Sequence, residues 1–251
     1  MRTERSSGMV MGVMCLLMLL ALLLVVPGTA VAQERPTGKL TMYGSTLEVV
    51  VREVALAFEQ QTGIKVSYIR MSTGEALNRI RAEKARAQAS IWFAGPGDSY
   101  LAAKQEGLLQ PYVSPVAARI APQYRDPEGH WAGLFTSVLG FASNTKILAE
   151  RKLNAPRSWT DLLKPEFKGQ VSVSNPGTSG TAYTFLSTIV QLMGEEKGFD
   201  YLKKLNGQIA QYPKTGMGPG QMAGRGELVA GILMLQDAYL LQKEGYPLEL
   251  T

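Results

Sequence analysis

The sequence has 251 residues with a formal net charge of +5, and 45% of them are hydrophobic while 19% are charged. This length suits one large or two small domains. Lys and Arg are scattered among acidic neighbours and form no basic stripe with interleaved aromatic residues, so the sequence argues against a nucleic-acid partner.

The first 32 residues have the pattern of a secretory signal peptide. Arg2 and Arg5 give a basic start, residues 9–26 are almost entirely apolar, and a small-residue cleavage site precedes Gln33. A membrane anchor is the alternative, because the apolar run reaches the lower end of bilayer-spanning length. Cys15 is the one cysteine and lies in this run, so cleavage leaves a chain that forms no disulfide and no thiolate metal site.

The next part of the chain predicts alternating strands and helices. Strands are expected at residues 39–43, 64–69 and 89–93, and each is followed by a helix with an apolar stripe. Two capping boxes, Ser45 with Glu48 and Ser72 with Glu75, predict where the first two helices begin. This pattern indicates a mainly parallel sheet that binds its ligand at the carboxyl ends of the strands.

The second half continues with the same kinds of element after an extended segment at residues 129–146. We interpret that segment as a crossover between two α/β lobes, the first formed by residues 33–140 and the second by residues 141–251. Ser158 and Asp98 are expected to cap helices, and the later elements are a strand at 170–174, helices at 181–193 and 197–205, a strand at 228–233 and a helix at 236–244.

Turns rich in hydroxyl groups and glycine follow three of the predicted strands and open the helices after them. A single turn of this kind is explained by helix capping. Three at equivalent places indicate an anion site, because helix N-termini and free N–H groups attract negative charge. The residues are Ser45, Thr46, Ser72, Thr73, Gly74, Thr178, Ser179, Gly180 and Thr181.

An enzyme that transfers or hydrolyses phosphate is the alternative for the same loops. Residues 175–185 contain no Lys or Arg and no phosphate-binding loop motif, and His130 is the one histidine. Because no nucleophile and base pair stands out, binding is favoured over catalysis. An accessory protein of a sensor, which presents a ligand without transporting it, is a third hypothesis.

Three stretches of the sequence together resemble the family-1 extracellular solute-binding proteins of ABC transporters, within the ferric-iron and organophosphate or phosphonate subgroup. They are LTMYGSTLEVVVREVALAFEQQTGIKV, IRMSTGEALNRIRAEKARAQASIWFAGPGD and SWTDLLKPEFKGQVSVSNPGTSGTAYT. The resemblance implies a periplasmic protein with the type 2 binding-protein fold: two α/β lobes with mixed sheets, joined by hinge crossovers. It also implies a monomer that holds a small anionic solute between the lobes and delivers it to membrane permease subunits.

The resemblance assigns the three hydroxyl-rich turns, together with Asp237, to ligand binding and implies no cofactor. Ferric-iron members place a tandem tyrosine pair after the strand at 228–233, where this sequence has Gln236-Asp237 and a separate Tyr239. Organophosphate-type members often have His-Asp there, so a phosphorylated or phosphonate solute is favoured. The alternative solute is Fe³⁺ held by Asp237 and Tyr239. For Asp237 itself, the alternative interpretation is a structural role as the N-cap of the last helix.

The resemblance also predicts that the first lobe is incomplete. Family members return to that lobe after a segment like residues 246–251, where this sequence stops. We therefore predict a truncated chain whose first lobe exposes a strand edge and apolar surface.

Overall fold

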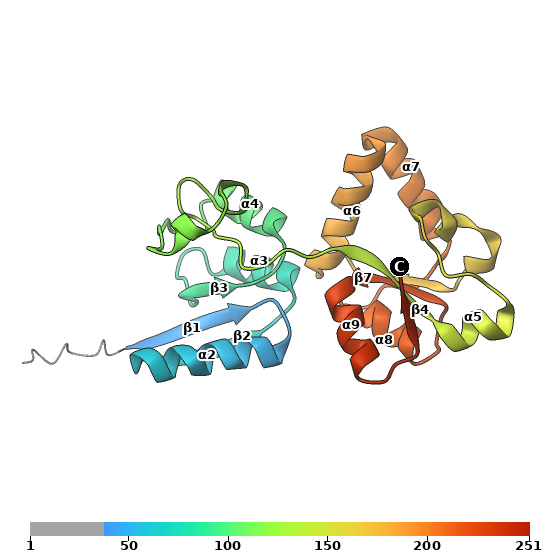
Figure 1. The fold of residues 1–251 in the computed structure, drawn as a ribbon. Helices are drawn as coiled ribbons and strands as arrows, with labels where there is room; N and C mark the ends of the chain where they lie inside the picture. Colours follow the sequence, from blue (N-terminus) through green and yellow to red (C-terminus); the bar gives the residue numbers. More distant parts are fainter. Residues whose placement is uncertain (1–37) are drawn as a thin grey trace, which may run out of the picture. The chain divides into compact units, whose positions relative to one another are not determined.

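The computed structural model describes residues 38–251, and the predicted signal peptide of residues 1–32 lies outside that range. The described residues belong to one compact unit. Within it are two separate sheets, one built from strands between residues 39 and 93 and one from strands between residues 139 and 250 (Figure 1). The division into lobes at residue 140 stays a prediction.

The first sheet has the order β2-β1-β3, and all its pairings are parallel. Its strands are β1 (Lys39–Gly44), β2 (Lys65–Arg70) and β3 (Ile91–Phe93), followed in turn by α2 (Glu48–Thr62), α3 (Thr73–Ala82) and α4 (Gly97–Gln105). Parallel strands require such crossover helices, as the alternating pattern predicted. The carboxyl ends of all three strands therefore lie at one edge of the sheet.

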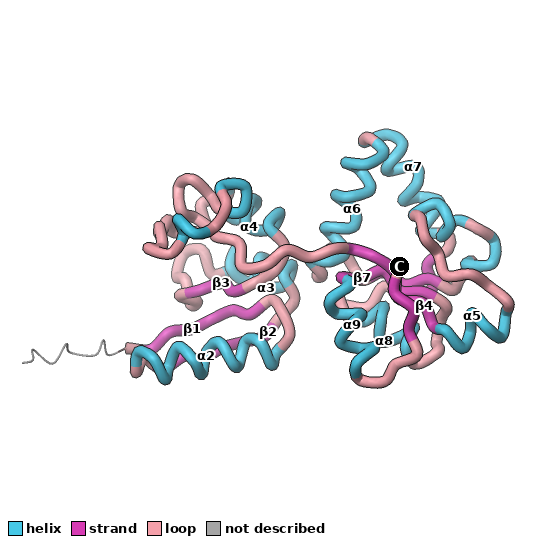
Figure 2. Tube along the Cα trace, in the orientation of Figure 1, coloured by secondary structure: helices cyan, strands magenta, loops and turns pink. Residues whose placement is uncertain are grey.

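The second sheet has the order β6-β5-β7-β4-β8 and is mixed. Strand β5 pairs in parallel with β6 and β7, whereas β4 pairs antiparallel with β7 and β8. Its strands are β4 (Leu139–Asn144), β5 (Val171–Val173), β6 (Ile209–Gln211), β7 (Ala230–Met234) and β8 (Leu248–Leu250). Its helices are α5 (Thr145–Arg151), α6 (Gly180–Met193), α7 (Glu195–Asn206), α8 (Gly218–Gly224) and α9 (Leu235–Lys243). Figure 2 shows the long loops that connect these elements.

Alternation along the strands of the second sheet builds two hydrophobic cores. Phe141 and Ile232 belong to the core that contains α6 and α7 residues, while their neighbours Ala142 and Leu233 belong to the core that contains α8 and α9 residues. Successive side chains of a strand point to opposite faces, so the two helix pairs cover opposite faces of this sheet (Figure 1). The rigid sheet fixes where α6 and α9 begin.

Two of the predicted helix starts are wrong, and one predicted helix is of another type. Helix α2 begins at Glu48 with Leu47 as its N-cap, so the box predicted for Ser45 and Glu48 does not form. Helix α4 has Pro96 as its N-cap, which places Asp98 inside the first turn instead. The segment after Ser158 is a 3-10 helix, Trp159–Leu163, capped by that serine as predicted.

Several apolar side chains of the first part of the chain are exposed, including Val49, Val54 and Leu56 of α2 and Ile91 of β3. The predicted truncation stays a prediction. No helix among residues 38–251 has both the length and the apolar character needed to cross a membrane.

Candidate functional site

A cavity of about 570 Å³ is lined by residues at the N-terminal ends of α2, α3, α4, α6 and α9. It therefore draws on both sheets. Of the sequence-predicted residues, those that line it are Ser45, Thr46, Ser72, Thr73, Ser179, Gly180, Thr181 and Asp237. Free backbone N–H groups at helix starts carry partial positive charge, so this convergence makes the cavity suited to an anion.

The start of α3 presents a buried hydroxyl with no partner. Ser72 is the N-cap and is only 6% exposed, and its backbone N–H donates to the Glu75 carboxylate at 3.0 Å, as in the predicted capping box. Its hydroxyl faces the Glu75 backbone N–H in this box, and the hydroxyl proton has no acceptor among the residues described. A buried polar group without a partner is costly, and a bound ligand would remove that cost.

The start of α6 presents a second set of donors. The Ser179 hydroxyl caps the helix by accepting from the Ala182 N–H at 3.4 Å, and it also accepts from the Ser174 hydroxyl at 2.9 Å. Because both contacts use it as an acceptor, its own proton remains free to donate. Gly180 follows it in the first helical turn, where backbone N–H groups have no intrahelical acceptor.

Hydroxyl and amide side chains extend along α6 beyond its first turn. They follow helical spacing on one face, and the opposite face buries Phe185 and Ile189 in the core. The side chains that line the cavity are Thr181, Thr184, Ser187, Thr188 and Gln191. Beyond Thr181, these polar residues were not predicted as part of the site, although their helical spacing in the sequence indicates a shared polar face.

Ser45 and Thr46 lie at the carboxyl end of β1. The Ser45 hydroxyl accepts from the Trp92 indole at 2.9 Å, and its backbone N–H donates to the Phe93 carbonyl at 2.8 Å. These contacts tie the turn to β3 and replace the expected capping role. The Ser45 hydroxyl proton is left for a ligand.

Arg70 is the one Arg or Lys among the described residues that line the cavity. It ends β2, and its Nε donates to the Thr46 carbonyl at 3.0 Å. The sequence analysis missed it, although its place between a strand and the Ser72 turn was a usable signal. A guanidinium there supplies a full positive charge that helix ends do not.

Gly74 and Thr178 differ from the other predicted residues because they do not line this cavity. The Gly74 N–H donates to the Thr178 carbonyl at 2.9 Å, and the Thr178 hydroxyl donates to the Lys214 carbonyl at 2.9 Å. The first bond joins the backbone at the start of α3 to the residue before the N-cap of α6, and the second ties the same turn to the loop after β6. Their role in the structure is to hold these three segments together.

Glycine is needed where the α3 and α6 ends approach. A Cβ atom on Gly180 would lie 2.7 Å from Cδ of Pro96 and 2.8 Å from the Thr73 hydroxyl oxygen. Gly95 has a φ of +107°, and a Cβ there would lie 2.9 Å from the same Thr73 oxygen. These separations are below normal contact, so both positions favour glycine.

Two carboxyl groups, Asp98 and Asp237, also line the cavity. Burial raises the pKa of Asp98, against the Ser99 N–H that donates to it at 2.8 Å. Burial raises the pKa of Asp237 to about 6, against the nearby positive charge of Arg70. The N-cap of α9 is Met234, so the interpretation of Asp237 as a cap is wrong. Its carboxyl group can accept hydrogen bonds from a ligand.

The alternative ferric pair is not brought together by the structure. Asp237 lines the cavity, whereas Tyr239 is outside the lining and 50% exposed, with the Lys243 ammonium 5.3 Å from its ring centre. Residues two apart on a helix point in different directions. Among residues 38–251, no three His, Cys, Asp or Glu side chains are grouped to hold a metal.

Trp131 and Thr184 are further lining residues that the sequence analysis missed. The indole Nε1 of Trp131 is buried and makes no hydrogen bond to the part of the chain described, while the buried Thr184 hydroxyl lies beside the Asp98 carboxyl group. Together with the Ser72 hydroxyl, the Trp131 indole gives the cavity two unpartnered donors. The polar spacing along α6 includes Thr184, whereas nothing local in the sequence marked Trp131, because its placement depends on how distant segments pack.

Comparison with known proteins identifies the family of this chain. The family model for bacterial extracellular solute-binding proteins matches residues 96–251. A protein of Haemophilus influenzae is 38% identical over 93% of this chain and 68% of its own length. The Fe(3+)-binding periplasmic protein of Serratia marcescens is 27% identical over 69% of this chain and 50% of its own length.

Among solved structures, the periplasmic binding protein AfuA of Actinobacillus pleuropneumoniae, with fructose-6-phosphate bound, is 39% identical with a TM-score of 0.82. The match covers 85% of this chain and 68% of AfuA. This chain thus spans about half to two thirds of the length of these relatives. The predicted type 2 binding-protein fold is confirmed, and the chain belongs to the family of bacterial extracellular solute-binding proteins.

Proposed function

We propose that this chain is the periplasmic solute-binding component of an ABC importer, and that its cavity captures a small anionic solute of the organophosphate or phosphonate type. The observation that carries the proposal is the convergence of several helix N-termini with Arg70 on one cavity. Each helix end supplies roughly half a positive charge, while a phosphate monoester carries about −1.5 to −2 at neutral pH. Several ends and one guanidinium together match that charge.

Within this class, a phosphorylated polyhydroxy compound fits the cavity best. The hydroxyl and amide side chains along α6 continue away from the helix N-terminus, and Asp237 supplies an acceptor. Such groups bind neutral hydroxyls, which a bare phosphate lacks. AfuA, the similar solved structure described above, contains fructose-6-phosphate.

Ferric ion remains the runner-up, because one relative is an Fe(3+)-binding periplasmic protein. A hard ferric ion prefers several anionic oxygen ligands. The exposed position of Tyr239, outside the cavity lining, leaves Asp237 without the partner that this alternative requires. The geometry therefore favours the organic anion.

The proposal is tested by calorimetric titration of the purified, periplasm-derived chain with fructose 6-phosphate, 2-aminoethylphosphonate, inorganic phosphate, fructose and ferric citrate. We expect saturable binding of a phosphorylated or phosphonate probe and none of fructose. Loss of a hydrogen bond to a charged group costs about 1.5–3 kcal/mol, so Arg70→Met should weaken binding roughly 10- to 100-fold. Arg151→Met, an exposed arginine at the end of α5 outside the cavity, is the matched control.

The outcomes separate the alternatives. Ferric binding without binding of any organic anion would establish the runner-up, and release of inorganic phosphate from the sugar phosphate would establish the enzyme. If neither organic anions nor iron bind, the solute-binding assignment of this cavity is overturned. An uptake defect in cells lacking the protein would support permease subunits as its partners.

A further inference from the structure

A short hairpin, residues 124–133, carries Trp131 to the cavity. The Arg125 and Ala132 backbones form an antiparallel bridge, and the Asp126 N–H donates to the Trp131 carbonyl at 3.0 Å. The turn Asp126-Pro127-Glu128-Gly129 has the residues of a type I turn, with Gly129 at φ +83°. The hairpin therefore has one defined backbone shape, and Trp131 is placed by it.

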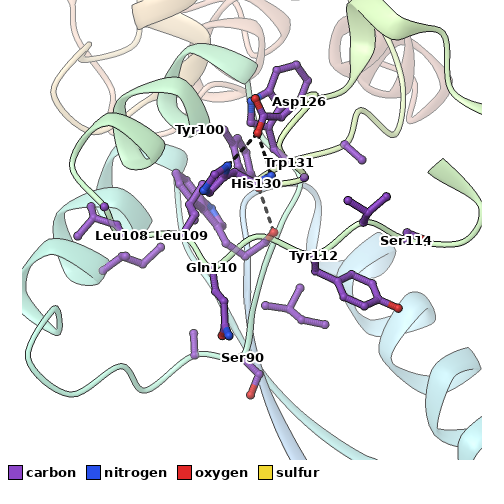
Figure 3. A pocket seen from close by; sticks show the side chains of 18 of the residues that line it. Ser90, Tyr100, Leu108, Leu109, Gln110, Tyr112, Ser114, Asp126, His130 and Trp131 are labelled. Atoms are coloured by element: carbon purple, nitrogen blue, oxygen red, sulfur yellow. Dashed lines mark hydrogen bonds and ion pairs between the residues drawn. The ribbon is translucent and has the colours of Figure 1, made fainter. Parts of the chain in front are cut away.

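The Asp126 carboxylate anchors this hairpin to α4. One of its oxygens accepts from the Lys104 ammonium at 2.7 Å. The other contacts the His130 backbone N–H at 3.0 Å and ring Nδ1 at 2.9 Å (Figure 3). Asp126 is only 8% exposed. Hydrogen bonding from Lys104, with further donation from His130, holds the pKa of Asp126 well below its usual range despite burial. The carboxylate is thus charged and fully engaged at neutral pH.

Helix α4 is itself part of the candidate site. Its first residues, Gly97 and Asp98, line the cavity of about 570 Å³, and Lys104 lies in its last turn. The Asp126 contacts therefore fix Trp131 relative to a helix that contacts the same cavity. A second cavity, of about 1020 Å³, is also lined by Trp131 (Figure 3), so this residue borders both cavities.

The Trp131 indole is the part of this hairpin whose hydrogen bonding is incomplete. Its Nε1 atom is buried and has no acceptor among residues 38–251. Trp92, in contrast, donates its indole N–H to the Ser45 hydroxyl at 2.9 Å. A tryptophan N–H is a donor only, and when buried it normally finds a partner. Trp131 lines a cavity proposed to bind an oxygen-rich solute, and that solute would supply the acceptor.

We propose that Trp131 determines solute specificity by donating a hydrogen bond from its indole nitrogen to an oxygen of the bound solute, and that Asp126 is the positioning residue that holds it there. This inference rests on the proposed function. It adds a donor from outside the hydroxyl-rich turns. It also explains why the Asp126 carboxylate is buried and paired although Asp126 does not line the candidate site.

The test is calorimetric titration of the parent chain and Trp131→Phe with fructose 6-phosphate, accompanied by tryptophan fluorescence. Phenylalanine keeps an aromatic ring and removes the donor. We expect roughly 10- to 100-fold weaker binding for a bond to charged phosphate oxygen, and a few-fold for one to a hydroxyl. In the parent, the solute should change the fluorescence, and this change should be absent from Trp131→Phe.

Asp126→Asn tests the positioning role through a double-mutant cycle. If Asp126 acts through Trp131, the double variant should bind no more weakly than Trp131→Phe alone. Asp161→Asn is the matched control, because Asp161 also pairs with a lysine, Lys164 at 2.7 Å, and lies outside this cavity. The control should bind like the parent.

The failures of the two proposals are distinguishable. If the parent binds no phosphorylated probe, the proposed function fails first. If the parent binds and Trp131→Phe binds equally well with the same fluorescence change, the donor role is overturned. Additive effects of the two substitutions would overturn the positioning role of Asp126, and a folding defect in Asp126→Asn leaves the Trp131→Phe comparison to decide.

Discussion

Glu75 and Lys214 form an ion pair between the first turn of α3 and the loop that follows β6. The same carboxylate accepts a hydrogen bond from the Ser72 N–H at 3.0 Å, so one side chain both caps α3 and joins it to the second sheet's loops. Burial raises the pKa of Glu75, but the bonds from Lys214 and Ser72 outweigh it and the net effect is a lower pKa.

Substitution at the two ends of this ion pair should have unequal effects. Exposed ion pairs contribute about 0–1 kcal/mol, and the Lys214 side chain is 67% exposed, so Lys214→Met should lower the free energy of unfolding by less than about 1 kcal/mol. Glu75→Ala also removes the cap and should cost roughly 1–2 kcal/mol more. Urea unfolding of both variants measures the two free-energy losses. Equal losses in the free energy of unfolding would contradict the capping role of Glu75.

Gly180→Ala should separate the starts of α3 and α6. The added Cβ would contact Pro96 and the Thr73 hydroxyl at less than normal distance, so we expect a loss of about 1–3 kcal/mol in stability and weaker fructose 6-phosphate binding. Gly97→Ala is the matched control, because Gly97 lines the same cavity and a Cβ there meets nothing within 4 Å. Thermal unfolding and calorimetry distinguish the two, and indistinguishable variants would contradict the close approach.

Ser179→Ala should weaken solute binding beyond its effect on the helix. Loss of the cap costs about 1 kcal/mol of stability, while loss of a donor to an anion should weaken fructose 6-phosphate binding roughly 10-fold or more. Ser158→Ala is the control, since Ser158 accepts from the Asp161 N–H at 3.3 Å as an N-cap elsewhere in the fold. Parent-like affinity in the Ser179 variant would remove this residue from the site.

Asp237→Asn should change the pH dependence of stability. Because burial raises the pKa of Asp237 to about 6, the folded chain binds this proton more tightly than the unfolded chain, whose aspartate pKa is about 3.9. The parent therefore loses stability through this group as pH rises from about 4 to about 6, by on the order of 1–3 kcal/mol. Asparagine removes that loss, so the variant should gain stability relative to the parent across this range.

Urea unfolding at several pH values tests this sign, because the other titrating groups are common to both chains. A constant difference between variant and parent would contradict the buried position of the carboxyl group. Asp237→Asn should weaken the binding of fructose 6-phosphate more than the binding of inorganic phosphate, since only the sugar offers hydroxyl donors to the carboxylate.

Local patterns in the sequence were sufficient for most of the first sheet. The alternation of strand and helix from residue 39 to residue 105 predicts β1 to α4, and Gly63 ends α2 with φ +79°, a left-handed conformation that favours glycine. The three-residue strands β6 and β8 were not predicted, whereas the equally short β3 and β5 were found within the predicted strands at 89–93 and 170–174. The predicted cap at Ser45 does not form, because the Ser45 hydroxyl accepts a hydrogen bond from the Trp92 indole instead.

The site residues could be predicted where they lie in turns directly after strands. The hydroxyl-rich turns line one cavity because helix starts and strand ends are fixed by the sheets. Trp131 and Thr184 could not be found in this way, because a loop and the middle of a helix reach the cavity only through packing. Gly74 and Thr178 matched the pattern of donors, yet the Gly74 N–H donates to the Thr178 carbonyl and the Thr178 hydroxyl donates to the Lys214 carbonyl in the loop after β6.

The backbone bond from Gly74 to Thr178 has a consequence for ionic strength. The Debye length falls from about 10 Å at 0.1 M salt to about 3 Å at 1 M, so the neighbouring pair of Glu75 and Lys214 is screened as salt rises. The Gly74 N–H and the Thr178 carbonyl carry no net charge, so their bond of 2.9 Å is insensitive to salt. Concentrated salt therefore removes the ionic part of this junction and leaves its peptide part in place.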